Sequence, residues 1–379
     1  MKILIIRNFP SYMDVKRNTY NIQEVGLAKA LVRKGHRCDI VFWTDKEEKD
    51  ELIQFGDGYS ISVFYRNSRV FLKNAIYRDL DDLIEKYDVI QPCEYNQLQS
   101  WLLAKKYPNK TVIFHGPYYS KFNKKYNALC RVMDLIVMPA YKKRKTPFLV
   151  KSHLAKKFLI NKGISENQIT TAGVGVDLNS FKVESLDTVP ENILKINDYS
   201  DKLRLLYIGR LEPRRNIPFL FDVLKQVYDR HIPVELIMIG DGESDYCEQC
   251  FKYAEELGVY ENIYHIKKAE QKYLSFAYQN ADIFLLPTNY EIFGMVLLEA
   301  MYFGKKVITT HNGGSEMLIK NGEDGIIIND FDAAKWCDAV IDLIDDKEIG
   351  KTAHKKIEAD FTWDSLCDTF VTAYQKRVE

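Results

Sequence analysis

The 379-residue chain lacks the marks of several common protein classes. It has no net charge at pH 7, so the field of the whole molecule does not indicate nucleic acid as a partner. No apolar run approaches the ~20 residues that a membrane-spanning helix needs. The four apolar residues before Arg7 predict a first strand rather than a signal peptide. The seven cysteines are scattered and odd in number, which argues against a disulfide framework and predicts a reducing, cytoplasmic location.

Two common phosphate-binding motifs are also missing. No G-x-G-x-x-G follows the first predicted strand, because Gly173/Gly175 and Gly240/Gly242 lack a third glycine. No G-x-x-x-x-G-K-[ST] occurs either, so a dinucleotide dehydrogenase or a P-loop NTPase has little support. The single C-x2-C pair has no second pair and no histidine at ligand spacing, so we predict no metal site.

The chain does contain two series of strands that alternate with helices. The strands predicted in the first half are 3–6, 38–42, 61–64, 89–91, 112–115 and 135–138, and the helices are 21–34, 97–106 and 147–162. The strands predicted in the second half are 203–209, 234–240, 262–266, 282–287 and 307–310. Such alternation is typical of parallel sheets covered by helices on both faces. We therefore predict an α/β fold with two doubly wound, Rossmann-like domains, at 1–180 and 200–360, facing a central cleft.

The densest signal is the segment 290–314. A predicted strand leads into Glu291, and a short helix follows that carries Glu299 and ends at Gly304. A strand–turn–helix unit presents free backbone N–H groups and the positive end of a helix dipole at the carboxyl edge of a sheet. This arrangement suits a phosphate group.

The Glu291–Glu299 spacing, with Phe293-Gly294 inside it and Gly313-Gly314 after it, resembles the E-x7-E motif of retaining glycosyltransferases with the GT-B fold, family 4 (glycosyl transferases group 1). Other stretches resemble further motifs of this family. They are 209–216 for G-R-L-x-x-x-K-G, 239–242 for I-G-x-G, 174–181 for N-G-V-D-x-x-x-F and 361–363 for F-x-W. In this family the closing helix, here 361–379, returns to the first domain.

The resemblance implies that the second half binds a nucleotide-diphosphate sugar. Arg210 and Arg215 would hold the diphosphate, with Arg214 as an alternative to Arg215, because arginine forks match phosphate oxygens and stay charged. Backbone N–H groups at the helix start would assist, from Phe293, Gly294, Met295 and Val296. Glu299 would bind the ribose and Glu291 the hydroxyls of the donor sugar. The nucleotide cleft would be lined by Gly209, Gly240 and Lys267, and Lys267 stands where a glycine is usual, which leaves the base open.

In the first half, the resemblance places His115, at the end of a predicted strand, close to the transferred sugar. The glycine-rich first loop of the family is replaced here by Asn18 and Thr19. These two residues can donate hydrogen bonds, and we predict that they form the phosphate and acceptor loop.

From these features we predict a retaining, metal-independent glycosyltransferase of the hexosyltransferase type. It would move a sugar from a nucleotide-diphosphate donor to a glycan, glycolipid or small-molecule acceptor, in cell-surface glycan or glycolipid biosynthesis, without a further cofactor. Two alternatives stay open: a nucleotide-sugar epimerase on the same fold, and a non-catalytic nucleotide-sugar-binding scaffold. An epimerase would act on the donor without an acceptor, and a scaffold would bind the donor without transfer.

The segment 142–158 is the other notable feature of the first half. It has seven Lys and Arg residues and no acid, interleaved with apolar residues such as Phe148 and Phe158. Such a segment suits peripheral contact with the inner, anionic face of a membrane. A solvated helix face is an equally good interpretation.

Overall fold

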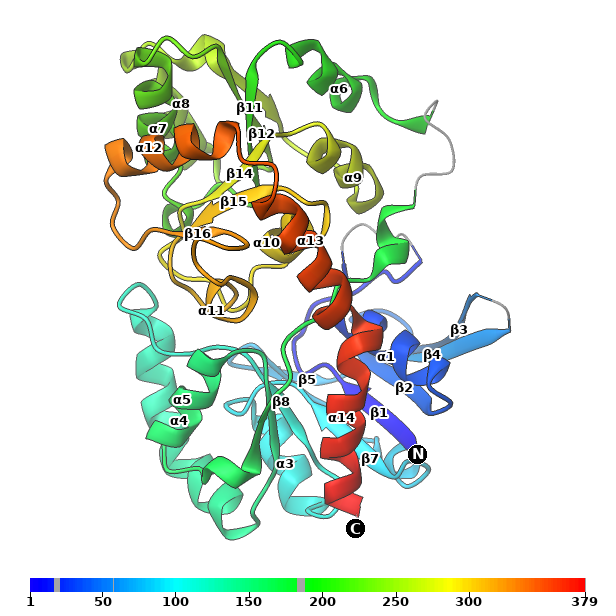
Figure 1. Ribbon diagram of the computed structural model, residues 1–379. Helices are drawn as coiled ribbons and strands as arrows, with labels where there is room; N and C mark the ends of the chain where they lie inside the picture. Colours follow the sequence, from blue (N-terminus) through cyan, green and yellow to red (C-terminus); the bar gives the residue numbers. More distant parts are fainter. Residues whose placement is uncertain (17–20, 57, 183–187, 379) are drawn as a thin grey trace. The chain divides into compact units, whose positions relative to one another are not determined.

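The computed structural model describes residues 1–16, 21–56, 58–182 and 188–378, and its chain divides into two compact units (Figure 1). Unit 1 comprises Met1–Gly175 and Thr362–Glu379, and unit 2 comprises Val176–Phe361. Each unit is a sheet flanked by helices, so the α/β fold with two Rossmann-like domains is confirmed.

Unit 1 contains a mostly parallel sheet in the order β3-β4-β2-β1-β7, and a shorter parallel sheet in the order β10-β9-β8. Their strands are β1 (Lys2–Ile6), β2 (Arg37–Trp43), β3 (Lys49–Phe55), β4 (Tyr59–Arg66), β7 (Val89–Pro92), β8 (Ile113–His115), β9 (Phe148–Val150) and β10 (Ile169–Thr171). Single bridges connect β7 and its following residues to the β8 segment. Within the five-stranded sheet, β3 runs antiparallel to β4. Residues Ile3–Ile6 are fully buried, as expected for a central parallel strand covered on both faces. A small hairpin of β5 (Arg69–Phe71) and β6 (Asn74–Ile76) completes the strands described in this unit.

The helices of unit 1 include one from the C-terminal end of the chain. They are α1 (Gln23–Arg33), α2 (Asp81–Ile84), α3 (Leu98–Lys106), α4 (Lys124–Lys143), α5 (His153–Asn161) and α14 (Trp363–Val378). Helix α14 lies against α1, because Gly26 has no side chain where Trp363 packs: a Cβ at Gly26 would lie 2.2 Å from Trp363 Nε1. Arg33 adds two hydrogen bonds to the carboxylate of Asp364, each 2.9 Å long.

Two predicted elements of unit 1 are wrong. The strand expected at 135–138 lies inside α4, where residues 133, 137 and 138 are buried and residues 132, 135 and 136 are exposed. This spacing follows the helical period of 3.6 residues, which the run of apolar residues concealed. The helix expected at 147–162 begins as strand β9, and α5 starts only after its N-cap Ser152, whose hydroxyl accepts the N–H of Ala155.

Unit 2 contains one parallel sheet in the order β13-β12-β11-β14-β15-β16. Its strands are β11 (Leu203–Ile208), β12 (Val234–Ile239), β13 (Ile263–Ile266), β14 (Ile283–Leu286), β15 (Lys306–Thr309) and β16 (Ile326–Ile327). Its helices are α6 (Glu191–Leu194), α7 (Ile217–Asp229), α8 (Ser244–Glu256), α9 (Gln271–Gln279), α10 (Met295–Tyr302), α11 (Ser315–Leu318), α12 (Ala333–Ile344) and α13 (Ile349–Asp360). Strands β12 and β14 are buried along their whole length, so this sheet is also covered on both faces.

Among the described residues, none of the helices combines the length and the hydropathy that crossing a bilayer requires.

Candidate functional site

The predicted strand–turn–helix unit is present in unit 2 at the carboxyl end of β14. The turn ends at Gly294, whose φ of 77° lies in the left-handed region that glycine adopts without strain, and α10 begins at Met295. As in any α-helix, the first backbone N–H groups of α10 have no acceptor within the helix. Met295 and Val296, two of the four residues predicted to bind the donor diphosphate, form the start of this helix, and Phe293 and Gly294 precede it.

The loop at 312–315 packs against this turn and forms hydrogen bonds with it. Gly313 donates its N–H to the carbonyl of Glu291 at 3.1 Å, and Asn312 Oδ1 accepts the N–H groups of Gly314 and Ser315. A Cβ at Gly314 would lie 1.5 Å from the carbonyl oxygen of Phe293. Backbone therefore packs directly on backbone here, and only glycine permits this approach.

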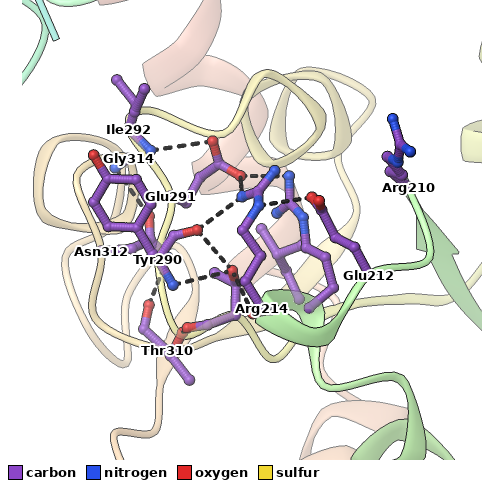
Figure 2. A network of polar contacts seen from close by, with 12 residues as sticks. Arg210, Glu212, Arg214, Tyr290, Glu291, Ile292, Thr310, Asn312 and Gly314 are labelled. Atoms are coloured by element: carbon purple, nitrogen blue, oxygen red, sulfur yellow. Dashed lines mark hydrogen bonds and ion pairs between the residues drawn. The ribbon is translucent and has the colours of Figure 1, made fainter. Parts of the chain in front are cut away.

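Glu291 lies at the centre of a polar cluster that joins this turn to the loop after β11 (Figure 2). Its Oε2 is 2.5 Å from Nη2 of Arg215 and 3.2 Å from Nη1 of Arg214. Arg214 also donates to the carbonyl of Tyr290 at 2.8 Å and to Glu212 Oε1 at 2.7 Å. Burial acts to lower the pKa of Arg214, but the charges of Glu291 and Glu212 outweigh it and raise the pKa. The two carboxylates therefore keep Arg214 charged despite its burial.

Arg215 and Arg210 differ in their surroundings. Arg215 is buried, and its Nε and Nη1 atoms lie out of contact with solvent and have no hydrogen-bond partner. Arg210 is exposed, and Figure 2 shows its side chain lying apart from the cluster around Glu291. The structure thus joins Arg214 and Arg215 to Glu291 and leaves Arg210 outside this cluster.

Asn216 takes the place of the glycine that is usual in the loop after β11, and it adopts the backbone conformation of a glycine. Its φ is 48°, a left-handed conformation that Asn tolerates better than most residues. Its amide donates to the carbonyl of Pro287 at 3.2 Å, and Asn289 donates to its Oδ1 at 2.9 Å. These bonds fix the loop after β11 to the segment after β14.

Glu299 lies on α10 and is 2% exposed. Its Oε1 accepts from Gln271 Nε2 at 2.9 Å and its Oε2 accepts from the hydroxyl of Tyr278 at 3.0 Å, both from α9. Burial, and then the charge of Glu299, raise the pKa of Tyr278 well above its usual value. Two buried donors therefore fix the orientation of this carboxylate.

The predicted nucleotide-cleft residues lie near the carboxyl ends of β11, β12 and β13. Gly209 and Gly240 have φ values of 151° and 145°, and a Cβ at Gly240 would lie 2.0 Å from the carbonyl oxygen of Gly209. Lys267 is exposed and follows β13 directly. It lines a cavity of 720 Å³ together with Gly242 and His265. Residues of α8 such as Cys247 and Phe251 also line this cavity, so it lies along α8 and β13 and reaches the chain that leaves β12.

In unit 1, His115 is fully buried at the end of β8. Its Nδ1 is 2.6 Å from Oε2 of Glu94, and the same oxygen accepts the N–H of Gly116 at 3.2 Å. His115 Nε2 is buried without a hydrogen-bond partner. The imidazole is therefore held at one nitrogen, and the other is enclosed without a hydrogen bond.

Glu94 reaches His115 from an unfavourable backbone conformation. Its φ of 63° lies in the left-handed region, where a glutamate is strained. Burial acts to raise the pKa of Glu94, but the electrostatic interaction and hydrogen bond with His115, the charge of Lys151 and the N–H of Gly116 outweigh it, so the pKa is lowered. The strained backbone thus presents a buried carboxylate to His115.

Comparison with known proteins gives these sites a family. Residues 189–361, nearly all of unit 2, match the sequence model of the family "Glycosyl transferases group 1". Unit 2 is a glycosyl transferases group 1 domain. The predicted resemblance is confirmed, and the chain is a glycosyltransferase homologue.

Three proteins illustrate the range of similarity to this chain. The "Uncharacterized glycosyltransferase MJ1607" of Methanocaldococcus jannaschii is 24% identical over 375 residues, 93% of each chain. A D-inositol 3-phosphate glycosyltransferase of Corynebacterium urealyticum is 27% identical over 177 residues, 45% of this chain and 42% of the relative. The crystal structure of Anabaena Alr3699/HepE in complex with UDP has a TM-score of 0.72 at 16% identity, covering 99% of this chain and 100% of that one. The structural likeness confirms the GT-B fold class.

Some contacts of the glycosyltransferase could not be predicted from its sequence. Glu94 and Gln271 were not identified, although each follows a predicted strand closely. Asn18 and Thr19, predicted to form the first loop, lie outside the described residues.

In the part of the chain that the structure describes, no group of three or more His, Cys, Asp or Glu side chains is arranged to hold a metal ion.

The predicted membrane surface at 142–158 is wrong in its apolar half. Phe148, Leu149 and Val150 form strand β9 and are at most 1% exposed, and Phe158 is also buried. The basic residues Lys142 and Lys143 are exposed, but they belong to α4.

Proposed function

We propose that this glycosyltransferase moves a sugar from a nucleotide-diphosphate donor to an acceptor hydroxyl, with retention of anomeric configuration and without a metal ion. The observation that carries the proposal is Arg215. It is buried beside the turn that opens α10, and two of its guanidinium nitrogens lack acceptors. Buried donors without acceptors are costly, and a diphosphate would supply the missing acceptors.

Negative charge develops on the leaving diphosphate during transfer, and the catalytic residues are those that stabilise this charge. Arg215, with Arg210 from the same loop, would stabilise this charge, and the first N–H groups of α10 would add the positive end of a helix dipole. Phosphoryl groups elsewhere obtain such stabilisation from Mg²⁺, and arginine provides it here without a metal. Glu299, oriented by its two donors from α9, would bind the ribose hydroxyls.

The transfer step needs no covalent enzyme intermediate. The bond between the anomeric carbon and the diphosphate oxygen breaks, and the acceptor oxygen forms the new bond on the same face. The acceptor proton passes to the leaving phosphate oxygen. His115, with Nε2 left available and Nδ1 held by Glu94, would position the sugar through its hydroxyls.

The similar solved structures suggest which donor to test first. HepE has been solved with UDP and with UDP-glucose, so a UDP-sugar is the first donor to test. We propose a hexose as the transferred sugar and a cell-surface glycan or glycolipid as the acceptor. The chain would act in the cytoplasm.

A thermal-shift panel of nucleotides and nucleotide sugars, with and without EDTA, tests the donor site. One nucleoside diphosphate should raise the melting temperature by several degrees, and chelation should not reduce the shift. The stabilising donor is then incubated with candidate acceptors. Conversion of the donor to its epimer without acceptor would favour the epimerase alternative, and binding without transfer or hydrolysis would favour a scaffold. No shift with any nucleotide would overturn the donor assignment.

A further inference from the structure

Helix α4 of unit 1 carries an exposed apolar face. Leu129, Val132, Leu135 and Ile136, spaced i, i+3, i+6 and i+7, are 37%, 61%, 81% and 46% exposed. We call these four residues the α4 face. The opposite side of the helix enters the core through Cys130, Met133, Val137, Met138 and Tyr141. The helix is therefore apolar on two sides, and the described residues cover only one of them.

Single exposed apolar residues are normal on a protein surface, but a group of neighbours is not. The α4 face extends over two turns of one helix, and Phe122, just before the helix, is also 47% exposed. Such a patch marks a surface that another body covers.

The charged residues around the α4 face indicate the chemistry of the surface that covers it. Lys124 and Lys125 begin the helix, Lys142 and Lys143 end it, and Arg131 lies between them. All five are exposed. Basic residues at both ends of an apolar face can extend their charged groups toward lipid phosphates while their stems lie along the acyl region.

The single acid of α4 is neutralised within unit 1. Asp134 forms an ion pair with Lys162, which is 5% exposed. The Nζ atom of Lys162 also lies 4.5 Å and 4.6 Å from the ring centres of Phe158 and Tyr119 and donates to the hydroxyl of Tyr119 at 2.7 Å. Asp134 is therefore balanced by a buried cation, and the helix surface is left with positive charge and apolar side chains.

We propose that the α4 face lies on the surface of a bilayer that contains anionic lipids, with the helix parallel to the membrane plane. The apolar residues enter the boundary between headgroups and acyl chains, and the five basic residues contact the lipid phosphates. This inference goes beyond the donor chemistry of unit 2 and stands without it. It also differs from the surface expected from the sequence, because α4, and not 148–158, provides the apolar contact.

Flotation of the full chain with vesicles tests the proposal. Binding to phosphatidylcholine vesicles that contain phosphatidylglycerol should be strong at low salt, weaker at high salt, and much weaker without the anionic lipid. The double variant Val132→Gln/Leu135→Gln should bind at least about tenfold more weakly, because two side chains lose their burial in the membrane. Leu52→Gln is the matched control, since Leu52 is 59% exposed on β3 and lies outside α4.

A second pair of variants separates charge from apolar burial. Lys124→Gln/Lys125→Gln should weaken binding to anionic vesicles about tenfold at low salt. Lys347→Gln/Lys355→Gln removes two exposed lysines of unit 2 and should change binding little. Melting temperatures and the thermal shift with the stabilising nucleotide should be the same in all variants, so a failed donor assignment would not affect this test.

Three results would overturn the proposal. The wild type could fail to float with anionic vesicles, or the two control variants could lose as much binding as the α4 variants. Sedimentation velocity could instead show self-association that Val132→Gln/Leu135→Gln abolishes without any vesicle binding. That last result would assign the α4 face to a second copy of the chain.

Discussion

Arg215→Met would test the donor site most directly. The side chain of Arg215 is 9% exposed, and its Nη2 pairs with Glu291 at 2.5 Å. Its Nε and Nη1 have no partner. Methionine keeps much of the buried aliphatic volume and removes the charge and all donors, so the variant isolates what the guanidinium contributes to phosphate binding.

The expected size of the effect follows from the two unpartnered nitrogens. A hydrogen bond to a charged group contributes about 1.5–3 kcal/mol, so two of them give about 3 kcal/mol at the lower limit. This corresponds to a roughly 100-fold increase in the Kd of a nucleoside diphosphate. Glu291 still has Arg214 at 3.2 Å, so its carboxylate is not left unpaired and the variant should fold.

Isothermal titration calorimetry with the stabilising nucleoside diphosphate, and with the nucleoside alone, measures the effect. The nucleoside should bind the variant and the wild type equally, because it lacks the diphosphate. Arg230→Met is the control, since Arg230 is 52% exposed and pairs with Asp338 on the surface. Unchanged diphosphate affinity in Arg215→Met, or an equal loss of nucleoside affinity, would refute the reasoning.

Three further predictions concern the fixed geometry of the two units. Glu299→Ala leaves two buried donors of α9 without an acceptor, so it should lower the free energy of unfolding by about 2–4 kcal/mol, measured by denaturant titration. It should also weaken nucleoside binding by about 1–3 kcal/mol, measured by calorimetry. Unchanged nucleoside affinity would contradict the ribose assignment. Gly314→Ala places a Cβ 1.5 Å from the Phe293 carbonyl and should cost about 3 kcal/mol of stability, whereas Gly322→Ala, which meets no atom but has a φ of 84°, should cost only about 1–2 kcal/mol. Glu94 has a lowered pKa in the folded state, so the stability that its carboxylate contributes is present above the unfolded pKa of about 4.3 and is lost as pH falls through the lower folded pKa. Urea titrations from pH 3 to pH 7 should therefore show a loss of stability in acid that is smaller in Glu94→Gln than in the wild type. Identical pH profiles of the two proteins would contradict this prediction.

The fold of unit 2 could be predicted well because its local signals agree with one another. A strand buried on both faces must be apolar at every position, and β12 and β14 are continuous apolar runs, apart from Glu235. Gly304, with a φ of 67°, ends α10 where a C-cap glycine was expected. The residues of a strand–turn–helix unit are also neighbours in sequence, so their spacing alone predicts where the turn before α10 lies.

In unit 1 the same reasoning fails where a contact depends on distant residues. The apolar run at 135–138 predicts a strand, because the run itself does not reveal which side of α4 the core will cover. Glu94 meets His115 only because its backbone is left-handed, and nothing in the preference of glutamate indicates that conformation. Such a strained position can be recognised only after the tertiary structure that stabilises it is known.

The position of Glu291 changes how its proposed role is best understood. The sequence assigned it to the hydroxyls of the donor sugar, but in the structure its Oε2 is engaged by Arg214 and Arg215. A carboxylate so placed partly neutralises two adjacent guanidinium groups, which would otherwise repel each other in a partly buried site. Its Oε1 accepts the N–H of Ile292, so the same side chain also fixes the turn before α10. In the proposed diphosphate site, Glu291 would therefore hold Arg215 in place, and any contact with the sugar would be made from this fixed position.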